Sequence, residues 1–201
     1  MIAGVILAAG ASSRMGGHPK ALLDYRGETF VARLVRVLGG VCDPVIVVLG
    51  YHAERVRPAV EARAQVVINP APERGQLSSL QTALAELPEH AEGFMFVPVD
   101  CPAAEPETAA RVAAAFRARD PRIQLVVPQY LGKHGHPVCA SRAIAEEMLA
   151  LPATAQARDV VHRHVVDTLY VDVDDPGILA DVDDPERYRR LAENAALKGG
   201  Q

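Results

Sequence analysis

Residues 2–20 read IAGVILAAGASSRMGGHPK, and this stretch decides the fold class. An apolar run, Ile2–Ala8, comes first, and a loop rich in glycine and serine follows it directly. A short apolar run without polar alternation is typical of a strand buried on both faces of a sheet. No basic segment precedes the run, so we interpret it as a core strand and not as a signal peptide.

Later runs rich in valine and isoleucine resemble the first, at Pro44–Leu49, Gln65–Ile68, Gly93–Val99 and Gln124–Val127. Helical patterns lie between them, at Glu28–Leu38, Ala53–Ala62, Leu77–Leu87 and Glu105–Arg117. This alternation predicts a mostly parallel sheet with helices on both faces. Towards the C-terminus we expect a turn at 132–136, a strand at Pro137–Ala140, a helix capped by Ser141 that runs to Leu149, a strand at Val165–Val173 and a helix at Pro185–Ala196.

The length of 201 residues, without a linker or repeat, predicts one domain over 1–197 and a disordered tail at 198–201. The net charge is −4 and no basic block occurs, so a nucleic-acid partner is not expected. No apolar stretch reaches about 18 residues, so no membrane partner is expected either. The three cysteines, Cys42, Cys101 and Cys139, lack the spacing of a disulfide framework or zinc site, and reduced thiols favour a cytoplasmic location.

The loop after Ile2–Ala8 has the features of a phosphate-binding loop. Gly10 lets the backbone approach a phosphate, while Arg14 and Lys20 offer a planar fork and a mobile point charge for its oxygens. It is not a Walker A loop, because no Gly-Lys-Ser/Thr follows, and the G-x-G-x-x-G dinucleotide fingerprint is absent. Taken alone, it is equally well interpreted as a flexible loop with two solvated cations.

In open α/β sheets, ligands bind beyond the carboxyl ends of the strands, so the loops after Ala8, Leu49, Ile68 and Val99 are expected to form a site. The segment after Ile68 opens a helix whose N–H groups and hydroxyls either contact a nucleotide or cap the helix. Asp100, at a strand tip, is either a Mg²⁺ ligand or a helix cap.

The first loop resembles the signature L-A-[AG]-G-x-S-x-R-M-G…K of the MobA-like NTP transferases. The matching residues, implied to bind the nucleotide, are Leu7, Ala8, Ala9, Gly10, Ser12, Arg14 and Lys20, with Arg14 and Lys20 also catalytic. The resemblance is greatest to the molybdenum cofactor cytidylyltransferase branch, which has Ala-Gly where guanylyl-transferring relatives have Gly-Gly. Ala9 therefore favours CTP. The segment from Met15 to Lys20 is one residue longer than in the shortest family members.

Four further segments resemble family motifs, in the family's order. Asn69, Gly75, Ser78 and Ser79 match N-x…G-x-x-S-S-L, which contacts base and ribose in relatives; Asp100 matches the catalytic, metal-binding Asp of P-x-D-x-P; His136 and Pro137 match the G-H-P of the acceptor side. The fourth, Asp181–Tyr188, resembles D-[IV]-D-T-P-E-D-Y and departs from it at Asp184 and Arg187.

Strand alternation would place Asp181 and Asp183 on one face, and we favour Asp183 as the second metal ligand. A satisfied turn histidine is an equal interpretation of His136. The other acidic run, 172–177, has no family counterpart and is interpreted as a polar turn.

The resemblance implies a three-layer α/β/α, Rossmann-like (GT-A-like) nucleotidyltransferase fold with a mostly parallel mixed sheet. It also implies Mg²⁺-dependent transfer of CMP from CTP to a phosphorylated acceptor, with release of pyrophosphate. Molybdopterin cofactor is the favoured acceptor, and a client molybdoenzyme is a conceivable partner. A sugar, polyol or phospholactate acceptor, or a non-catalytic nucleotide- or cofactor-binding chaperone of the same fold, are the alternatives.

Overall fold

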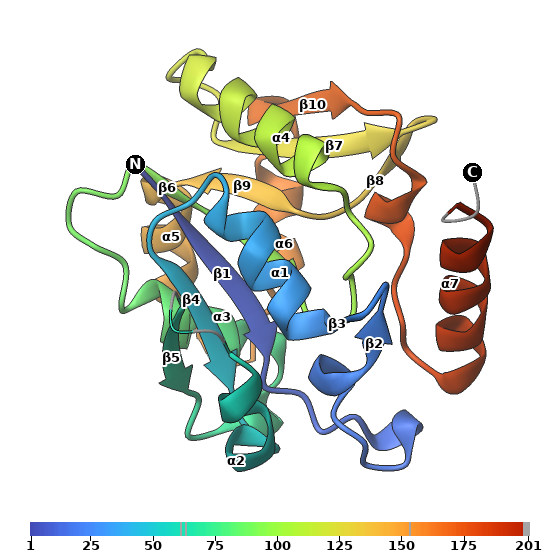
Figure 1. Cartoon of the computed structure of the whole chain (residues 1–201). Helices are drawn as coiled ribbons and strands as arrows, with labels where there is room; N and C mark the ends of the chain where they lie inside the picture. Colours follow the sequence, from blue (N-terminus) through green and yellow to red (C-terminus); the bar gives the residue numbers. More distant parts are fainter. Residues whose placement is uncertain (61, 63, 153, 199–201) are drawn as a thin grey trace.

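A computed structural model describes residues 1–60, 62, 64–152 and 154–198 of the chain. Its centre is an eight-stranded sheet in the order β10-β7-β9-β6-β1-β4-β5, with β8 paired to β7 (Figure 1). The strands are β1 (Ile2–Ala8), β4 (Val45–Leu49), β5 (Ala64–Ile68), β6 (Gly93–Pro98), β7 (Leu125–Tyr130), β8 (Lys133–His134), β9 (Val138–Ser141) and β10 (Thr168–Asp172). A separate short hairpin pairs β2 (Asp24–Tyr25) with β3 (Glu28–Thr29).

The sheet is mostly parallel, as the sequence predicts. β1 pairs in parallel with β4 and β6, β4 pairs in parallel with β5, and β10 with β7, whereas β9 runs antiparallel to both of its neighbours. The register aligns Ala8 with Leu49, and Leu49 with Ile68. The carboxyl ends of β1, β4 and β5 therefore meet at one edge, where the expected loops emerge.

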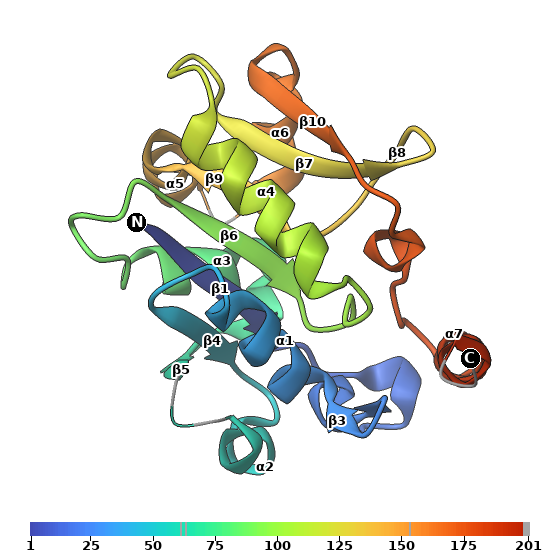
Figure 2. The same cartoon turned by 45° about the horizontal axis from the view of Figure 1, so that its top comes forward.

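Helices cover both faces of the sheet and make a three-layer molecule (Figure 2). They are α1 (Phe30–Gly39), α2 (Ala53–Val56), α3 (Gln76–Leu84), α4 (Pro106–Ala118), α5 (Arg142–Leu149), α6 (Ala157–Arg163) and α7 (Pro185–Lys198). One core cluster joins the sheet to α1 and α4, and a second joins it to α3, α5 and α6. Because β1 and β4 lie between these layers, every residue of both strands is buried.

Several helices begin at side-chain caps, among them α7, where the Asp184 carboxylate accepts a hydrogen bond from the Arg187 N–H at 2.9 Å. The Thr29 hydroxyl accepts a hydrogen bond from the Ala32 N–H at the start of α1, and the Ser141 hydroxyl accepts one from Ile144 at the start of α5. Such caps satisfy N–H groups that have no partner within the helix. The predicted cap at Ser141 is confirmed.

Several predicted boundaries are wrong. The helix expected at Ala53–Ala62 ends at Val56 and continues as a 3₁₀ turn over Arg57–Ala59, because Pro58 has no N–H to donate to the carbonyl four residues before it. Position 61 lies outside the described residues. The strand expected at Val165–Val173 is shorter, since Val165–Asp167 form a 3₁₀ turn. Part of the turn expected at 132–136 is the short strand β8.

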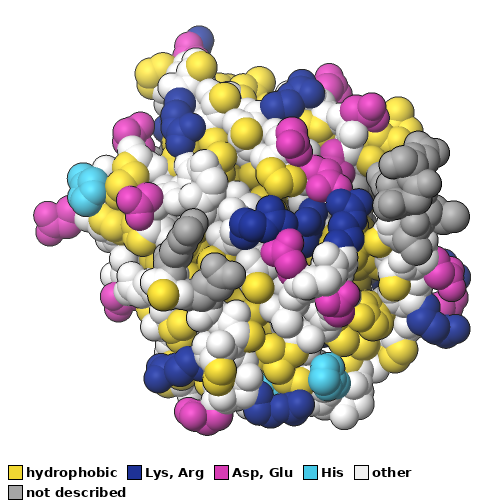
Figure 3. Space-filling model, in the orientation of Figure 1, with side chains coloured by type: hydrophobic (Ala, Val, Ile, Leu, Met, Phe, Trp, Pro, Cys, Tyr) yellow, Lys and Arg dark blue, Asp and Glu magenta, His cyan; other side chains and the backbone are white. Residues whose placement is uncertain are grey.

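The structure also has elements that the sequence analysis did not anticipate, namely α6 and the β2–β3 hairpin. In the expected tail, Lys198 is the last residue of α7, and 199–201 lie outside the described residues. No helix in the described part of the chain is both long and apolar enough to cross a bilayer. On the face seen in Figure 3, basic and acidic side chains are interspersed, and several lie next to one another near its centre.

Candidate functional site

A cavity of about 300 Å³ opens at the sheet edge where β1, β4, β5 and β6 end. Its lining comes from the β1 loop, from His52 before α2, from the segment that leads into α3 and from the segments that follow β6 and precede α7. The residues are Leu7, Ala8, Ala9, Gly10, Ser12, Ser13, Arg14, Pro19, Lys20, Ala21, His52, Pro72, Gly75, Gln76, Ser79, Pro98, Val99, Asp100 and Asp183. Segments far apart in sequence therefore converge at the predicted edge.

The loop after β1 is a compact turn. Ser12 has a φ of 52°, and Gly16 and Gly17 have φ values of 62° and 76°, in the left-handed region that favours glycine. A 3₁₀ turn spans Ser13–Met15, and the Ser12 hydroxyl accepts a hydrogen bond from the Lys20 N–H at 3.1 Å. The loop thus folds back at Ser12, and this brings Lys20 into the cavity.

The segment after β4 anchors this loop. The Tyr51 N–H donates to the Ala9 carbonyl at 3.3 Å, and Arg55 donates to the Gly17 carbonyl at 3.4 Å. His52 Nε2 lies 2.9 Å from the Ala11 carbonyl oxygen, and it is the donor because a carbonyl can only accept. The sequence analysis missed His52, although its place after a strand tip at the expected edge was a usable signal.

Lys20 joins two carboxylates. Its Nζ lies 3.1 Å from Asp100 Oδ2 and 2.8 Å from Asp183 Oδ1, and its side chain is only 13% exposed. Burial alone would lower the pKa of Lys20, but the hydrogen bond to Asp183 and the charge of Asp100 outweigh it and raise that pKa. The same hydrogen bond lowers the pKa of Asp183. Lys20 is therefore held charged, and Asp183 is held ionised.

Arg14 contacts the Asp183 carboxylate from the solvent side. Its Nη1 lies 3.1 Å from Asp183 Oδ2, and its side chain is 70% exposed. An exposed guanidinium is screened by water and reorients easily, so it can turn to a phosphate at little cost. The two predicted cations thus meet two of the three predicted acidic residues.

Asp181 lies outside the cavity lining. It is exposed and forms an ion pair with Arg187. The expected strand alternation is wrong here, since residues 180–183 form no strand. A backbone hydrogen bond from Val182 to the Asp100 carbonyl, at 2.8 Å, instead sets the path of this segment and leaves Asp183 beside Asp100.

In the region from the end of β5 to the first turns of α3, some residues line the cavity and others hold them in place. Gly75 and Ser79 line the cavity, whereas Asn69 and Ser78 do not. Asn69 is buried, donates to the hydroxyls of Ser78 and Ser79 at 2.9 and 3.0 Å, and accepts from the Ala71 N–H at 2.9 Å. Its amide therefore holds Ser79 against the cavity from the protein side. Gln76, which the sequence analysis did not single out, also lines the cavity.

His136 and Pro137 also lie outside the cavity lining, and His136 is next to Cys101, the residue that follows Asp100. His136 Nδ1 is 3.9 Å from Cys101 Sγ, and its ring meets Phe96 edge-on at 5.7 Å. Burial lowers the pKa of His136 to about 4, although the charge of Asp100 opposes this shift. The imidazole is therefore neutral near pH 7 and can take part in hydrogen bonds without carrying a charge.

The donor set at the cavity fits a hard divalent cation. Asp100 and Asp183 place carboxylate oxygens around one point, the Lys20 ammonium. Mg²⁺ binds through one or two carboxylates and completes its shell with water and phosphate oxygens. Among the described residues no group of three or more His, Cys, Asp or Glu side chains gathers at one point, so this pair does not belong to a larger cluster.

Residues 4–168 match the family described as MobA-like NTP transferase domain. The chain belongs to this family. The match includes the glycine turn, Lys20 and Asp100, and it ends before Asp183. The fold and this membership identify the MobA-like chain as a nucleotidyltransferase.

Similar proteins agree over nearly the whole length. Nicotine blue oxidoreductase from Paenarthrobacter nicotinovorans is 32% identical, covering 94% of this chain and 96% of that protein. Molybdenum cofactor guanylyltransferase from Shewanella frigidimarina is 26% identical, with 96% of each chain covered. The crystal structure of Rv0371c from Mycobacterium tuberculosis has a TM-score of 0.81 and 36% identity, covering 96% of this chain and 97% of that one, and a further structure of that protein is a complex with manganese.

Proposed function

We propose that this MobA-like chain transfers CMP from CTP to molybdopterin cofactor, with Mg²⁺ as its metal. In this reaction an oxygen of the terminal phosphate of the acceptor attacks the α-phosphorus of CTP. The new P–O bond forms as the bond to the β-phosphate oxygen breaks, and pyrophosphate leaves with the electron pair. The observation that carries the proposal is the convergence of Lys20, Asp100 and Asp183 in a cavity beside the glycine turn.

The roles of the residues follow from charge and position. Mg²⁺ held by Asp100 and Asp183 would supply positive charge to the phosphates. Lys20 and Arg14 neutralise charge on the transferring and leaving groups, and catalysis of this kind depends on positioning more than on covalent chemistry. The loop N–H groups and Ser12 bind the phosphates, and Gly75 and Ser79 face the nucleoside. Asn69 acts through Ser79, and Ser78 acts through Asn69 and the Gly75 carbonyl.

The preference for CTP rests on Ala9. This residue is 4% exposed and lines the cavity, and a Cβ added to Gly50 would lie 2.9 Å from its methyl group. The methyl group therefore occupies the wall between the β1 and β4 tips. Glycine at this position, as in guanylyl-transferring relatives, would leave more room for a purine. The Ala9 methyl group narrows the cavity at this place and therefore favours the smaller pyrimidine base.

The acceptor follows from the relatives and from the G-H-P segment. Several relatives are named as molybdenum cofactor guanylyltransferases, and the match to one of them covers almost all of this chain. His136 lies next to Cys101, and we assign His136 and Pro137 to the acceptor side. A sugar, polyol or phospholactate acceptor would use the same nucleotide half of the site, so only the acceptor assay separates these alternatives.

The test is pyrophosphate release with each NTP, each acceptor class and Mg²⁺, for the wild type and Ala9→Gly. We expect release with CTP and molybdopterin, and a shift of the CTP to GTP ratio of kcat/KM towards GTP in Ala9→Gly by about 10-fold. Equal use of GTP by the wild type would refute the CTP assignment. Release with another acceptor only would refute the molybdopterin assignment, and no release with any pair would favour the binding chaperone.

The relative named nicotine blue oxidoreductase motivates a second candidate, oxidation or reduction of an aromatic heterocycle. The cavity argues against it, because paired carboxylates with a lysine suit phosphate and metal better than an uncharged ring. A change in the visible absorbance of nicotine blue in the presence of the protein and a reduced nicotinamide would favour this candidate. Pyrophosphate release without that change would exclude it.

A further inference from the structure

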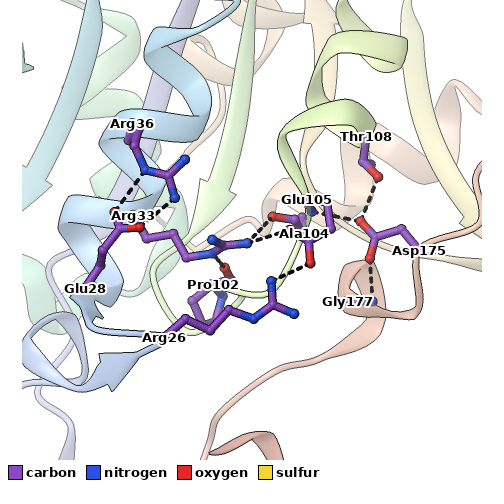
Figure 4. Close-up of polar contacts among 10 residues, drawn as sticks. All are labelled: Arg26, Glu28, Arg33, Arg36, Pro102, Ala104, Glu105, Thr108, Asp175 and Gly177. Carbon is purple, nitrogen blue, oxygen red and sulfur yellow. Dashed lines mark hydrogen bonds and ion pairs between the residues drawn. The ribbon is translucent and has the colours of Figure 1, made fainter. Parts of the chain in front are cut away.

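A buried arginine lies beside the loop that carries Asp100. Arg33, on α1, is 4% exposed, and its guanidinium donates to the Pro102 carbonyl at 2.8 Å, to the Ala104 carbonyl at 3.3 Å and to the Glu105 carboxylate at 2.9 Å (Figure 4). A buried charge is tolerated only when it is paired and hydrogen-bonded. These partners all lie within five residues of Asp100, so Arg33 fixes the course of this loop.

A buried carboxylate holds the same loop from the other side. Asp175 is 7% exposed and accepts hydrogen bonds from the Glu105 N–H at 2.9 Å, the Thr108 hydroxyl at 2.7 Å and the Gly177 N–H at 2.8 Å. It is part of the acidic run that the sequence analysis interpreted as a polar turn. Asp175 does cap a turn, at Pro176–Leu179, and its carboxylate also joins this turn to the start of α4 (Figure 4).

The chain around Asp175 packs closely on the loop. A Cβ added to Gly177 would lie 2.2 Å from the Ala103 carbonyl oxygen, which leaves no room for a side chain. Further along, the Val182 N–H donates to the Asp100 carbonyl at 2.8 Å. The segment that ends at Asp183 is therefore attached to the Asp100 loop at two places, through the Asp175 carboxylate and through the Val182 backbone.

These contacts determine where the two cavity carboxylates lie relative to each other. Asp100 comes directly before the loop that Arg33 holds, and Asp183 comes at the end of the segment that Asp175 holds. Neither Arg33 nor Asp175 is among the described residues that line the cavity. Both residues act on one loop from opposite sides, with Glu105 between them (Figure 4).

We infer that Arg33 and Asp175 are positioning residues which set the spacing of the Asp100 and Asp183 carboxylates for a divalent cation. The inference rests on the proposed metal role of these carboxylates. Partners behind metal ligands commonly change metal affinity when they are replaced, because they orient the ligands. Loss of the Arg33 contacts or of the Asp175 contacts would let the Asp100 and Asp183 carboxylates move apart, while the nucleotide half of the site stays in place.

The test measures Mn²⁺ binding to the full chain by electron paramagnetic resonance of free Mn²⁺, without substrates. Asp175→Asn places an amide N–H₂ among three donors, and Arg33→Lys keeps the charge but loses the fork. Each is expected to weaken Mn²⁺ binding by about 10-fold. Asp172→Asn and Arg36→Lys are matched controls, because Asp172 pairs with Gln129 and Arg36 with Glu28 away from this loop. Both controls should bind like the wild type.

Asp183→Asn separates this inference from the proposed function. If it loses Mn²⁺ binding while Asp175→Asn and Arg33→Lys bind within about two-fold of the wild type, the positioning roles are overturned and the metal assignment stands. If Asp183→Asn binds normally, both are overturned. Thr108→Val removes one hydrogen bond to Asp175 and serves if Asp175→Asn does not fold. Weaker Mn²⁺ binding by Thr108→Val, with an unchanged dissociation constant for CTP, supports the inference. Unchanged Mn²⁺ binding by this variant overturns it.

Discussion

Lys20 connects the loop after β1 to two acidic residues that lie 80 and 163 positions further along the chain. Without this cation, Asp100 and Asp183 would face each other as like charges in a partly buried site, which disfavours ionisation of both. The lysine therefore compensates the two carboxylates in the resting structure, in addition to the role we propose for it at a phosphate. A bound divalent cation would compensate the same two carboxylates, so its effect on stability should depend on whether Lys20 is present.

Lys20→Met removes the ammonium and keeps the length of the side chain. We expect kcat/KM to fall by about 100- to 1000-fold, as for the loss of a preorganised charge next to a reacting group. We also expect the melting temperature of Lys20→Met to rise more on addition of Mg²⁺ than that of the wild type, because the unpaired carboxylates attract the cation. Steady-state kinetics and thermal denaturation with EDTA or Mg²⁺ measure the two effects.

Lys133→Met is the matched control, since Lys133 is exposed on β8 and away from the cavity lining. It should keep the activity and the Mg²⁺ response of the wild type. An active Lys20→Met variant would contradict the catalytic role. A variant that is inactive but gains no extra stability from Mg²⁺ would contradict the idea that the lysine compensates the two carboxylates.

The sequence was informative about residues whose motif places them at a strand tip. Asp100 follows β6 at the edge where the parallel strands end, whereas Lys20 and Asp183 reach it through the turn after β1 and the backbone hydrogen bond of Val182. Motifs say less about which side of a loop a residue occupies. Asn69 and His136 belong to predicted motifs but lie outside the cavity lining, and their placement depends on tertiary hydrogen bonds that no local pattern encodes.

At the scale of elements, the buried strands were predicted well and the surface elements less well. β1, β4 and β6 are apolar throughout, and their packing between two helical layers fixes both type and extent. The helix α6 was missed because only Val160 is buried among its residues, so its apolar periodicity is weak. Polar contacts to α5 add to the packing of Val160 in the second core cluster.

These contacts centre on Glu147 of α5. Its carboxylate accepts hydrogen bonds from Arg163 at 2.9 Å and pairs with His164 Nε2 at 2.7 Å. Burial would raise the pKa of Glu147, but the hydrogen bonds from Arg163 and His164 lower it below its usual value of 4.5. A pKa that is lower in the folded state stabilises the fold above the unfolded pKa, and this contribution is lost as the pH falls through the folded pKa.

We expect Glu147→Gln to lower the free energy of unfolding at pH 7 by about 0.5–1 kcal/mol, a value reduced for partial solvent exposure. The difference from the wild type should shrink as the pH falls below 4.5, because the wild-type carboxyl then becomes neutral as well. Urea denaturation of both proteins at pH 7 and near pH 3 measures whether the difference in the free energy of unfolding shrinks in acid. Glu146→Gln is the control, since Glu146 is the more exposed neighbour and pairs only loosely with Arg142 at 3.5 Å. A difference that grows towards acid pH would contradict the assignment.

At the scale of the whole molecule, one continuous sheet passes through both core clusters, and the chain crosses it repeatedly. The C-terminal strand β10 lies at one edge and β5 at the other, while β1, the first strand, lies between β6 and β4. Helix α7 returns to the N-terminal half, where the Tyr188 hydroxyl donates to the Asp24 carbonyl at 3.0 Å and its ring meets Phe30 edge-on. Helix α7 therefore cannot leave the fold without exposing Phe30, which is buried in the core.

This interleaving predicts that residues 1–197 unfold as a single cooperative domain. Tyrosine fluorescence and far-ultraviolet circular dichroism should give the same urea midpoint, because the five tyrosines are spread over both halves and tryptophan is absent. CTP with Mg²⁺, at 100 times the CTP dissociation constant, should raise the free energy of unfolding by about 2.7 kcal/mol with both probes, since the ligand binds the folded state only. Two separated midpoints, or a ligand shift seen by one probe alone, would contradict a single domain and would indicate that the half of the sheet around β7 and β10 unfolds independently of the nucleotide site.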